Sequence, residues 1–428
     1  MAFSSSSLFR LIKAKGIVGS SSNYCMLGKW SARYRSSLFN LRGLTTATAT
    51  MASDSVLNQD SSPWLMLPPE IEAGTTTYKF YNLADDKVLT RCLSDEIRNL
   101  RLTCRGSSHG WLALLSQHDD GIFLYNPISR RHIKLPSILN LPTDDPYEEF
   151  LKSARSVTKV ILSCSPDEDE DNCRVLILRG WDNAPAFCCP GRSKEWTLIL
   201  DEQSGRTIFY SDFVYSSRRN LFYAVDSDGV ETWDLGDLSS PKLIKVDKFI
   251  LEEFFYSPSF KWFKSKFLCG SKEHLVVAKE DLLYVVQCIM YDVAPDGLCF
   301  DIDSYGHRHM TIGFDIFKYD SEKGKFKYLD SSSLGDLAIF VGSHNHSVAI
   351  QVTEFPGVKP NSIYFTDVSD TGNLEDARAY NNRQIGGHDI GIYNYHDKTV
   401  SPCYYPCDVP SMKKILPAPI WFFPSRTI

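Results

Sequence analysis

The sequence lacks the features that most often identify a function. No stretch approaches the roughly 18 consecutive apolar residues that cross a bilayer, and the longest apolar run, LLYVVQCIMY (residues 282–291), has the length of a strand. It contains no P-loop, no dinucleotide-binding glycine motif and no H-E-x-x-H zinc motif. The sequence therefore predicts no transmembrane segment, no cofactor, no metal site and no catalytic residue.

The cysteines lack the spacing of a disulfide or zinc framework. There are 12 of them in 428 residues, and no two are arranged as C-x-x-C. A chain of this length can bury a core without covalent staples. We interpret the cysteines as reduced thiols that serve mostly as small apolar core residues.

Residues 1–50 lack acidic side chains altogether, since the first is Asp54. Serine is abundant, and Leu8, Phe9, Leu11 and Ile12 would share one face of a helix. This composition predicts an organellar transit peptide, mitochondrial rather than plastidial, that is disordered and removed; a basic tail is the alternative. The segment contains seven basic residues, namely Arg10, Lys13, Lys15, Lys29, Arg33, Arg35 and Arg42.

The transit peptide defines the predicted domain boundaries. Residues 51–62 would form a linker and residues 63–428 a single folded domain. Translation starting at Met51 would give a second, cytosolic form that loses all seven presequence charges; the alternative is that Met51 is only an internal residue.

Removal of the basic segment makes the remaining chain strongly acidic. The whole chain carries 46 basic and 52 acidic residues, so without those seven cations 39 remain against 52, a formal charge of −13. Such a surface repels phosphates unless it has a concentrated basic face, and none is visible along the sequence. We therefore expect no nucleic-acid partner.

Short strands and turns dominate the body of the chain, and aromatic residues reach 13%. One pattern recurs: an alternating strand, a polar turn with a basic residue, then a second strand, as in a hairpin. It occurs in residues 121–136, 195–213, 229–247, 314–330 and 389–406. We interpret these hairpins as the outer strands of propeller blades.

Apolar segments between the hairpins supply the inner strands. They include GWLALLS (residues 110–116), LFYAVDSDG (221–229) and HLVVAKEDLLYVVQCI (274–289). The count predicts an all-β fold, one β-propeller of about six four-stranded blades, with five to seven compatible with the pattern. A sixth blade would join residues 78–83 to residues 417–423 and so close the ring.

Several segments together resemble a plant family, the KIB-type β-propellers, long catalogued as domain of unknown function 295. The similar segments are SSPWLMLPPE (61–70), GSSHGWLAL (106–114), IFLYNPISRRHIKLP (122–136), LFYAVDSDGVETWDL (221–235), KPNSIYFTD (359–367), DIGIYNYHDKTVSP (389–402) and PIWFFPS (419–425). The resemblance implies protein partners. Members commonly carry an N-terminal F-box that docks on ubiquitin-ligase scaffolds.

This chain departs from the family at the F-box. LPPEI (residues 67–71) could open an F-box, but AGTTTYKFYNL (73–83) is rich in Gly and Thr and unsuited to the helices that must follow. A presequence occupies the place of the F-box, which resembles an organellar branch of the family.

Three motifs have both a functional and a structural interpretation. GSSHG (residues 106–110) matches the G-x-S-x-G nucleophile elbow, but strands follow where an elbow needs a helix, so we expect a tight turn. His307 with His309, and His344 with His346, could each offer two imidazoles to a metal, but no third ligand stands at standard spacing. The acidic run 167–171 could bind a basic partner, but it lacks the spaced ligands of a calcium loop and we expect a solvated loop.

We conclude from the sequence that the chain is an interaction protein and not an enzyme. It would bind one or more protein partners through the loops of the propeller. An enzyme with its active site in the propeller funnel, or an F-box-free regulator related to ubiquitin-ligase receptors, are the alternatives.

Overall fold

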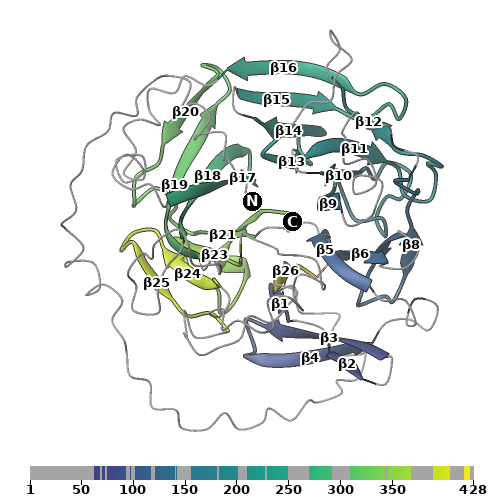
Figure 1. Cartoon of the computed structure of the whole chain (residues 1–428). Coiled ribbons are helices and arrows are strands. Elements are labelled where there is room, and N and C mark those ends of the chain that lie inside the picture. Colours follow the sequence, from purple (N-terminus) through teal and green to yellow (C-terminus); the bar gives the residue numbers. More distant parts are fainter. Residues whose placement is uncertain are drawn as a thin grey trace, which may run out of the picture.

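The computed structural model describes residues 62–67, 70–72, 75–92, 97, 102–116, 121–139, 141, 156–180, 183–200, 210–226, 229–248, 269–291, 309–342, 346–367, 389–404 and 419–424. Within these residues the chain forms six β-sheets arranged as a ring (Figure 1). Each sheet is one blade, so the predicted six-bladed propeller is confirmed. No described segment is a helix long and apolar enough to cross a membrane.

Four blades follow a simple meander from the centre outward. Blade 2 contains β5 (Leu102–Ser108), β6 (Trp111–Ser116), β7 (Ile122–Tyr125) and β8 (His132–Lys134). Blade 3 contains β9 (Val157–Leu162), β10 (Val175–Arg179), β11 (Ala184–Cys188) and β12 (Thr197–Leu198). Blade 4 contains β13 (Asp212–Ser216), β14 (Leu221–Val225), β15 (Gly229–Asp234) and β16 (Lys242–Lys248). Blade 5 contains β17 (Cys269–Ala278), β18 (Asp281–Tyr291), β19 (His309–Asp320) and β20 (Lys325–Tyr328).

Blade 6 departs from the meander. It contains β22 (Val348–Gln351), β21 (Leu337–Val341), β23 (Ser362–Phe365), β24 (Gly391–Asn394) and β25 (Thr399–Ser401). β22 follows β21 in sequence but lies on the side of β21 that faces the centre of the ring, so the chain must cross β21 before it forms β23. The connection includes the 3₁₀ turn Val352–Glu354, and β23 consequently pairs parallel with β21.

Blade 1 closes the ring with both ends of the folded chain. It contains β26 (Ile420–Phe422), β1 (Trp64–Met66), β3 (Thr75–Asn82) and β4 (Lys87–Cys92), and β2 (Glu70–Glu72) also pairs with β3. The prediction that residues 78–83 and 417–423 share a sheet is confirmed. However, β1 lies between them, because β26 pairs with β1 and β1 with β3. The two ends of the described chain are therefore joined in one sheet, which closes the ring.

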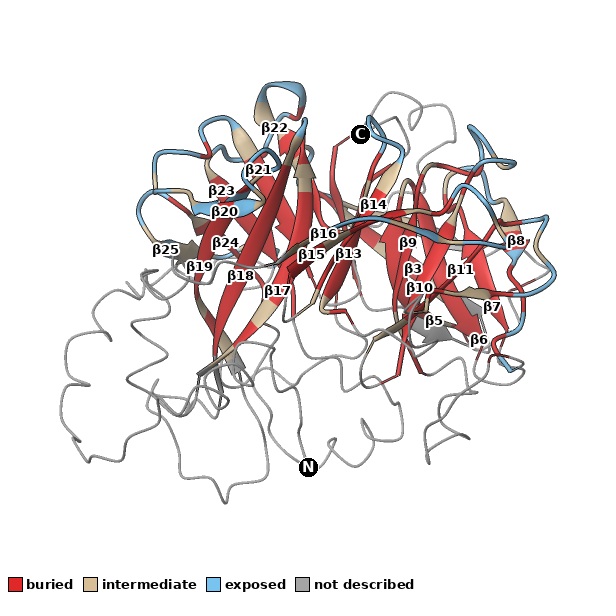
Figure 2. Ribbon diagram, turned by 90° about the horizontal axis from the view of Figure 1, so that it is seen from above, coloured by how far each residue is buried: buried red, intermediate tan, exposed pale blue. Residues whose placement is uncertain are grey.

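The hydrophobic core is divided among the six contacts between neighbouring blades. A buried cluster lies at each contact, and alternate residues of one strand join different clusters. Trp64 packs between blades 1 and 2, whereas Leu65 packs between blades 1 and 6. Strands buried on both faces read as continuous apolar runs, as in WLALLS of β6. Figure 2 shows buried residues through the body of the ring and exposed residues in its loops.

Four of the five predicted hairpins are confirmed as β7–β8, β15–β16, β19–β20 and β24–β25. The prediction for residues 195–213 is wrong. β12 is the outer strand of blade 3 and pairs with β11, whereas β13 is the innermost strand of blade 4 and pairs with β14. Both strands alternate as the two strands of a hairpin do, and this led to the wrong prediction. Residues 201–209, which connect them, lie outside the described part of the chain.

Candidate functional site

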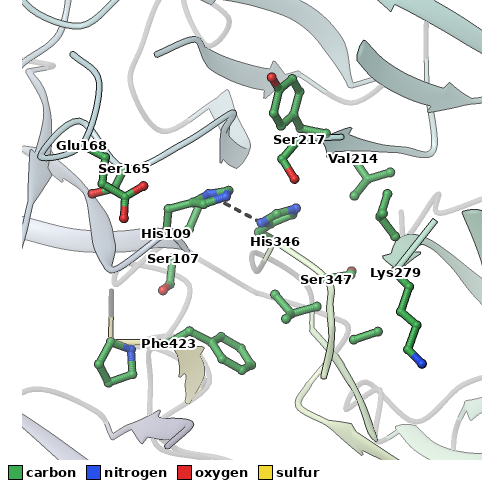
Figure 3. Close-up of a pocket in the computed structure, with 16 residues that line it drawn as sticks. Ser107, His109, Ser165, Glu168, Val214, Ser217, Lys279, His346, Ser347 and Phe423 are labelled. Atoms are coloured by element: carbon green, nitrogen blue, oxygen red, sulfur yellow. Dashed lines mark hydrogen bonds between the residues drawn. The ribbon is translucent and has the colours of Figure 1, made fainter. Parts of the chain in front are cut away.

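A pocket of about 170 Å³ lies where the innermost strands of all six blades converge. We call it the central pocket. Each blade contributes at least one side chain to its wall: Phe423 from blade 1, Ser108 from blade 2, Ser165 from blade 3, Val214 from blade 4, Val277 from blade 5 and Val348 from blade 6. Figure 3 shows His109 and His346 facing each other near the middle of this pocket.

The G-x-S-x-G match lies at the wall of the central pocket, in the β5–β6 hairpin. Ser108 is the last residue of β5, and His109 and Gly110 form the turn, both with positive φ (48° and 76°). Trp111 then pairs back with Ser108 as β6 begins. The segment is therefore strand, turn and strand, and it lacks the helix of a nucleophile elbow. The predicted tight turn is confirmed.

The Ser108 hydroxyl is the centre of a hydrogen-bond network that joins three blades. Its Oγ accepts a hydrogen bond from the backbone N–H of Leu162 in blade 3, at 3.1 Å. It also lies 3.0 Å from Nδ1 of His109 and 3.3 Å from Nδ1 of His346, which belongs to blade 6. Ser108 is only 4% exposed, so these partners surround it.

The two imidazoles are held in an environment that favours their neutral forms. Their rings stack with centroids 5.3 Å apart. Burial lowers the pKa of His109 to about 4, and burial together with the neighbouring His109 lowers the pKa of His346 well below its usual range. At neutral pH each ring therefore carries one N–H and one bare nitrogen.

Two polar atoms of the central pocket have no partner among the described residues. They are Nε2 of His346 and Oγ of Ser347, and both are buried. An unsatisfied buried polar atom costs about 1–3 kcal/mol, so such atoms call for an explanation. Because both residues line the pocket, a ligand there could satisfy them.

The edge of the pocket is charged and exposed. Glu168 and Lys279 contribute there. The acidic run that includes Glu168 was expected to be a solvated loop, but part of it is tethered. Arg131 of blade 2 forms ion pairs with Asp167, at 3.1 Å, and with Glu170. The acidic loop thus bridges blades 2 and 3.

A second polar cluster joins the innermost strands of blades 3, 4 and 5. Lys159 lies 2.5 Å from Asp212, and both side chains are less than a tenth exposed. The other carboxylate oxygen of Asp212 accepts a hydrogen bond from the backbone N–H of Leu275 at 2.9 Å. This cluster ties the three blades together.

The predicted histidine pairs are not the pair that the fold assembles. His307 and His344 lie outside the described residues. His346 instead meets His109, which precedes it by more than 200 residues and was not considered as its partner. Within the described residues, no group of three or more His, Cys, Asp or Glu side chains could hold a metal ion.

Comparison with known proteins agrees with this architecture. The model of the KIB1-4 beta-propeller family matches residues 80–394. Two relatives from Arabidopsis thaliana have names that place them among F-box proteins. At1g65770 is 24% identical over 62% of this chain and 68% of its own length, and At4g22660 is 20% identical over 87% and 88%.

Two solved structures align weakly with this chain. YCF48 from Cyanidioschyzon merolae aligns with a TM-score of 0.32 and 13% identity, over 64% of this chain and 74% of that one. AztD from Citrobacter koseri aligns with a TM-score of 0.31 and 12% identity, over 67% of this chain and 75% of that one.

The family match extends from β3 to β24 and so includes strands of all six blades. The chain belongs to the KIB1-4 beta-propeller family.

Proposed function

We propose that this protein is an organellar interaction module that binds a protein partner at the face of the central pocket. The size of the pocket carries the proposal. Pockets for cofactors and other small ligands typically enclose about 300–1,000 Å³, whereas this one encloses about 170 Å³. It suits one side chain of a protein whose surface rests on the surrounding loops.

The family relationship supports a binding role, but the fold does not support an F-box at residues 67–71. F-box proteins are among the relatives, but the segment that resembles an F-box start is part of the propeller here. Leu67 is buried between blades 1 and 6, and β2 and β3 follow it. The described residues between 67 and 82 therefore form propeller strands and not the helices of an F-box, and any link to ubiquitin ligases would need another segment.

The site chemistry supports a role in binding and not in catalysis. A serine nucleophile needs access to its substrate and a base that is oriented by a third group. Ser108 is buried, its hydroxyl is engaged by three groups, and no carboxylate among the described residues lies within hydrogen-bond distance of His109 or His346.

A pocket-filling variant tests the binding role. The full chain with a C-terminal tag on a long linker is recovered from isolated organelles beside Ala349→Phe, which fills the central pocket, and Val246→Lys, which changes an exposed residue of blade 4. We expect a reproducible protein partner with the natural chain and with Val246→Lys, and its loss with Ala349→Phe. Recovery of a small molecule without a protein would instead favour an enzyme.

We further propose that residues 1–50 direct the protein to mitochondria, with Met51 as the start of a cytosolic form. The seven basic residues and the absence of acid in this segment support import. Both forms retain β1, which begins at Trp64. A reporter fused to residues 1–50 tests the address, and a diffuse reporter would refute it. Met51→Ala in the tagged full chain should remove only the cytosolic species.

A further inference from the structure

The Ser108 hydroxyl has one proton to share between two imidazoles. One of its lone pairs accepts the Leu162 N–H, at 3.1 Å. The remaining lone pair and the single O–H proton face Nδ1 of His109 and Nδ1 of His346. A hydroxyl donates one hydrogen bond and accepts two. Its capacity is therefore met when one imidazole accepts from it and the other donates to it.

This arrangement imposes opposite tautomers on the two rings. The imidazole that accepts the Ser108 proton at Nδ1 carries its own proton on Nε2. The imidazole that donates Nδ1–H to Ser108 has a bare Nε2. If both rings were protonated on Nδ1, the Ser108 proton would have no acceptor. If both were protonated on Nε2, the Nδ1 lone pair of one ring would face a lone pair of Oγ. Either arrangement is costly in a buried site.

We propose that the central pocket is a receptor for a carboxamide, the side chain of an asparagine or glutamine of the protein partner. The inference rests on the proposed function and names the group that the pocket recognises. A carboxamide has one carbonyl acceptor and two N–H donors. It can accept from the protonated Nε2 of one ring and donate to the bare Nε2 of the other.

The unpartnered atoms and the charge of the pocket favour this group over others. Nε2 of His346 is buried without a partner among the described residues, and Oγ of Ser347 beside it could add a further bond. A carboxylate can only accept and an ammonium can only donate, so each would leave one ring unsatisfied. An alkyl chain would leave both rings unsatisfied. A hydroxyl could bridge the two rings in the way that Ser108 does on their other side. It has one donor, however, whereas a carboxamide has a second N–H to offer to Oγ of Ser347.

The tautomers can be measured directly in the full chain. We would label the ten histidines with ¹⁵N and use long-range proton–nitrogen couplings, assigning the two rings from His109→Asn and His346→Phe. At pH 7 we expect one ring protonated on Nδ1 and the other on Nε2, with Ser108→Ala abolishing this fixed pairing. The same tautomer in both rings, or a charged ring at pH 7, would overturn the inference.

Ligand preference is tested with capped amino acids. The probes are the N-acetyl methylamides of glutamine, glutamate, norleucine and serine, titrated while the two imidazole signals are followed. One satisfied hydrogen-bond pair corresponds to about a tenfold difference in affinity. We expect glutamine to bind about tenfold more tightly than the others, and His346→Phe to remove that preference. Equal binding, or tighter binding of glutamate or serine, would contradict the proposal.

These measurements separate failure of the inference from failure of the proposed function. If a partner is recovered from organelles but its recovery is insensitive to His346→Phe, the protein binds partners and the carboxamide receptor is wrong. If the glutamine probe binds and no protein partner is recovered, the receptor stands and the interaction role is wrong. His396→Phe, the same substitution at an exposed position of the β24–β25 turn outside the pocket, is the matched control.

Discussion

Trp64 and Phe422 lie directly opposite each other in blade 1, with ring centroids 5.5 Å apart. One residue comes from the first described strand and the other from the last. Both rings are fully buried, and Phe80 completes the aromatic cluster. The contact fastens the two ends of the chain, so the stability of the whole ring should depend on it.

Removing the Phe422 ring should therefore destabilise the protein substantially. Phe422→Ala leaves a cavity in the closing sheet, and such substitutions cost about 3–5 kcal/mol. Urea unfolding should show a lower midpoint. Ile244→Ala in β16, at a side chain that is 51% exposed, should leave the midpoint almost unchanged. Equal midpoints for the two variants would show that blade 1 does not control closure.

Asp212 should be another site of high cost, because it links three blades. Asp212→Asn keeps the shape of the side chain but leaves the Lys159 ammonium buried without a counter-ion. Loss of one partner of a buried pair costs about 3–5 kcal/mol. Asp281→Asn is the control, because Asp281 pairs with Lys318 at an exposed position. Comparable losses of unfolding free energy in the two variants would contradict this assignment.

A side chain at Gly357 should lower the stability of the protein. Its φ is +84°, and a Cβ would lie 2.8 Å from the carbonyl oxygen of Leu83 in blade 1. Gly357→Ala should cost about 1–3 kcal/mol. Gly335→Ala has a comparable φ of +55° but no atom within 4 Å, so it should cost less. The difference between the thermal midpoints of the two variants measures how closely Gly357 approaches Leu83. Equal midpoints would show that the connection from β22 to β23 does not pack against blade 1.

Stability should fall with acid partly because of His109. The pKa of its imidazole is about 4 in the folded protein and about 6.5 in an unfolded chain. Between these values the unfolded chain binds the extra proton, so the free energy of unfolding decreases as pH falls, by up to about 1.4 kcal/mol per pH unit. His109→Asn suits the positive φ and should flatten this slope between about pH 6 and pH 4.5. An unchanged slope would show that His109 is not desolvated.

Ser108 should be structural and chemically inert. A serine-reactive fluorophosphonate and generic ester substrates should give no labelling and no turnover that Ser108→Ala abolishes. The same variant should lose about 1–3 kcal/mol of stability, because it leaves the Leu162 N–H and the two imidazoles without their common partner. Labelling that depends on Ser108 would establish a hydrolase and overturn the binding role.

Local sequence patterns determined most of the secondary structure. Period-two alternation and polar turns located the β7–β8, β15–β16, β19–β20 and β24–β25 hairpins, because a strand with one buried face must alternate. The strand-like composition of residues 73–83 also predicted β3 where an F-box would need helices. These features depend only on neighbouring residues.

Pairing and the pocket depended on tertiary structure. Alternation is identical in a hairpin and in two strands of successive blades, so residues 195–213 were assigned to one sheet instead of two. Ser108 and His346 are 238 positions apart, and only closure of the ring through β1 and β26 brings them to 3.3 Å. A sequence pattern records which residues can form a strand, whereas the position of that strand in the ring depends on packing against both neighbouring blades.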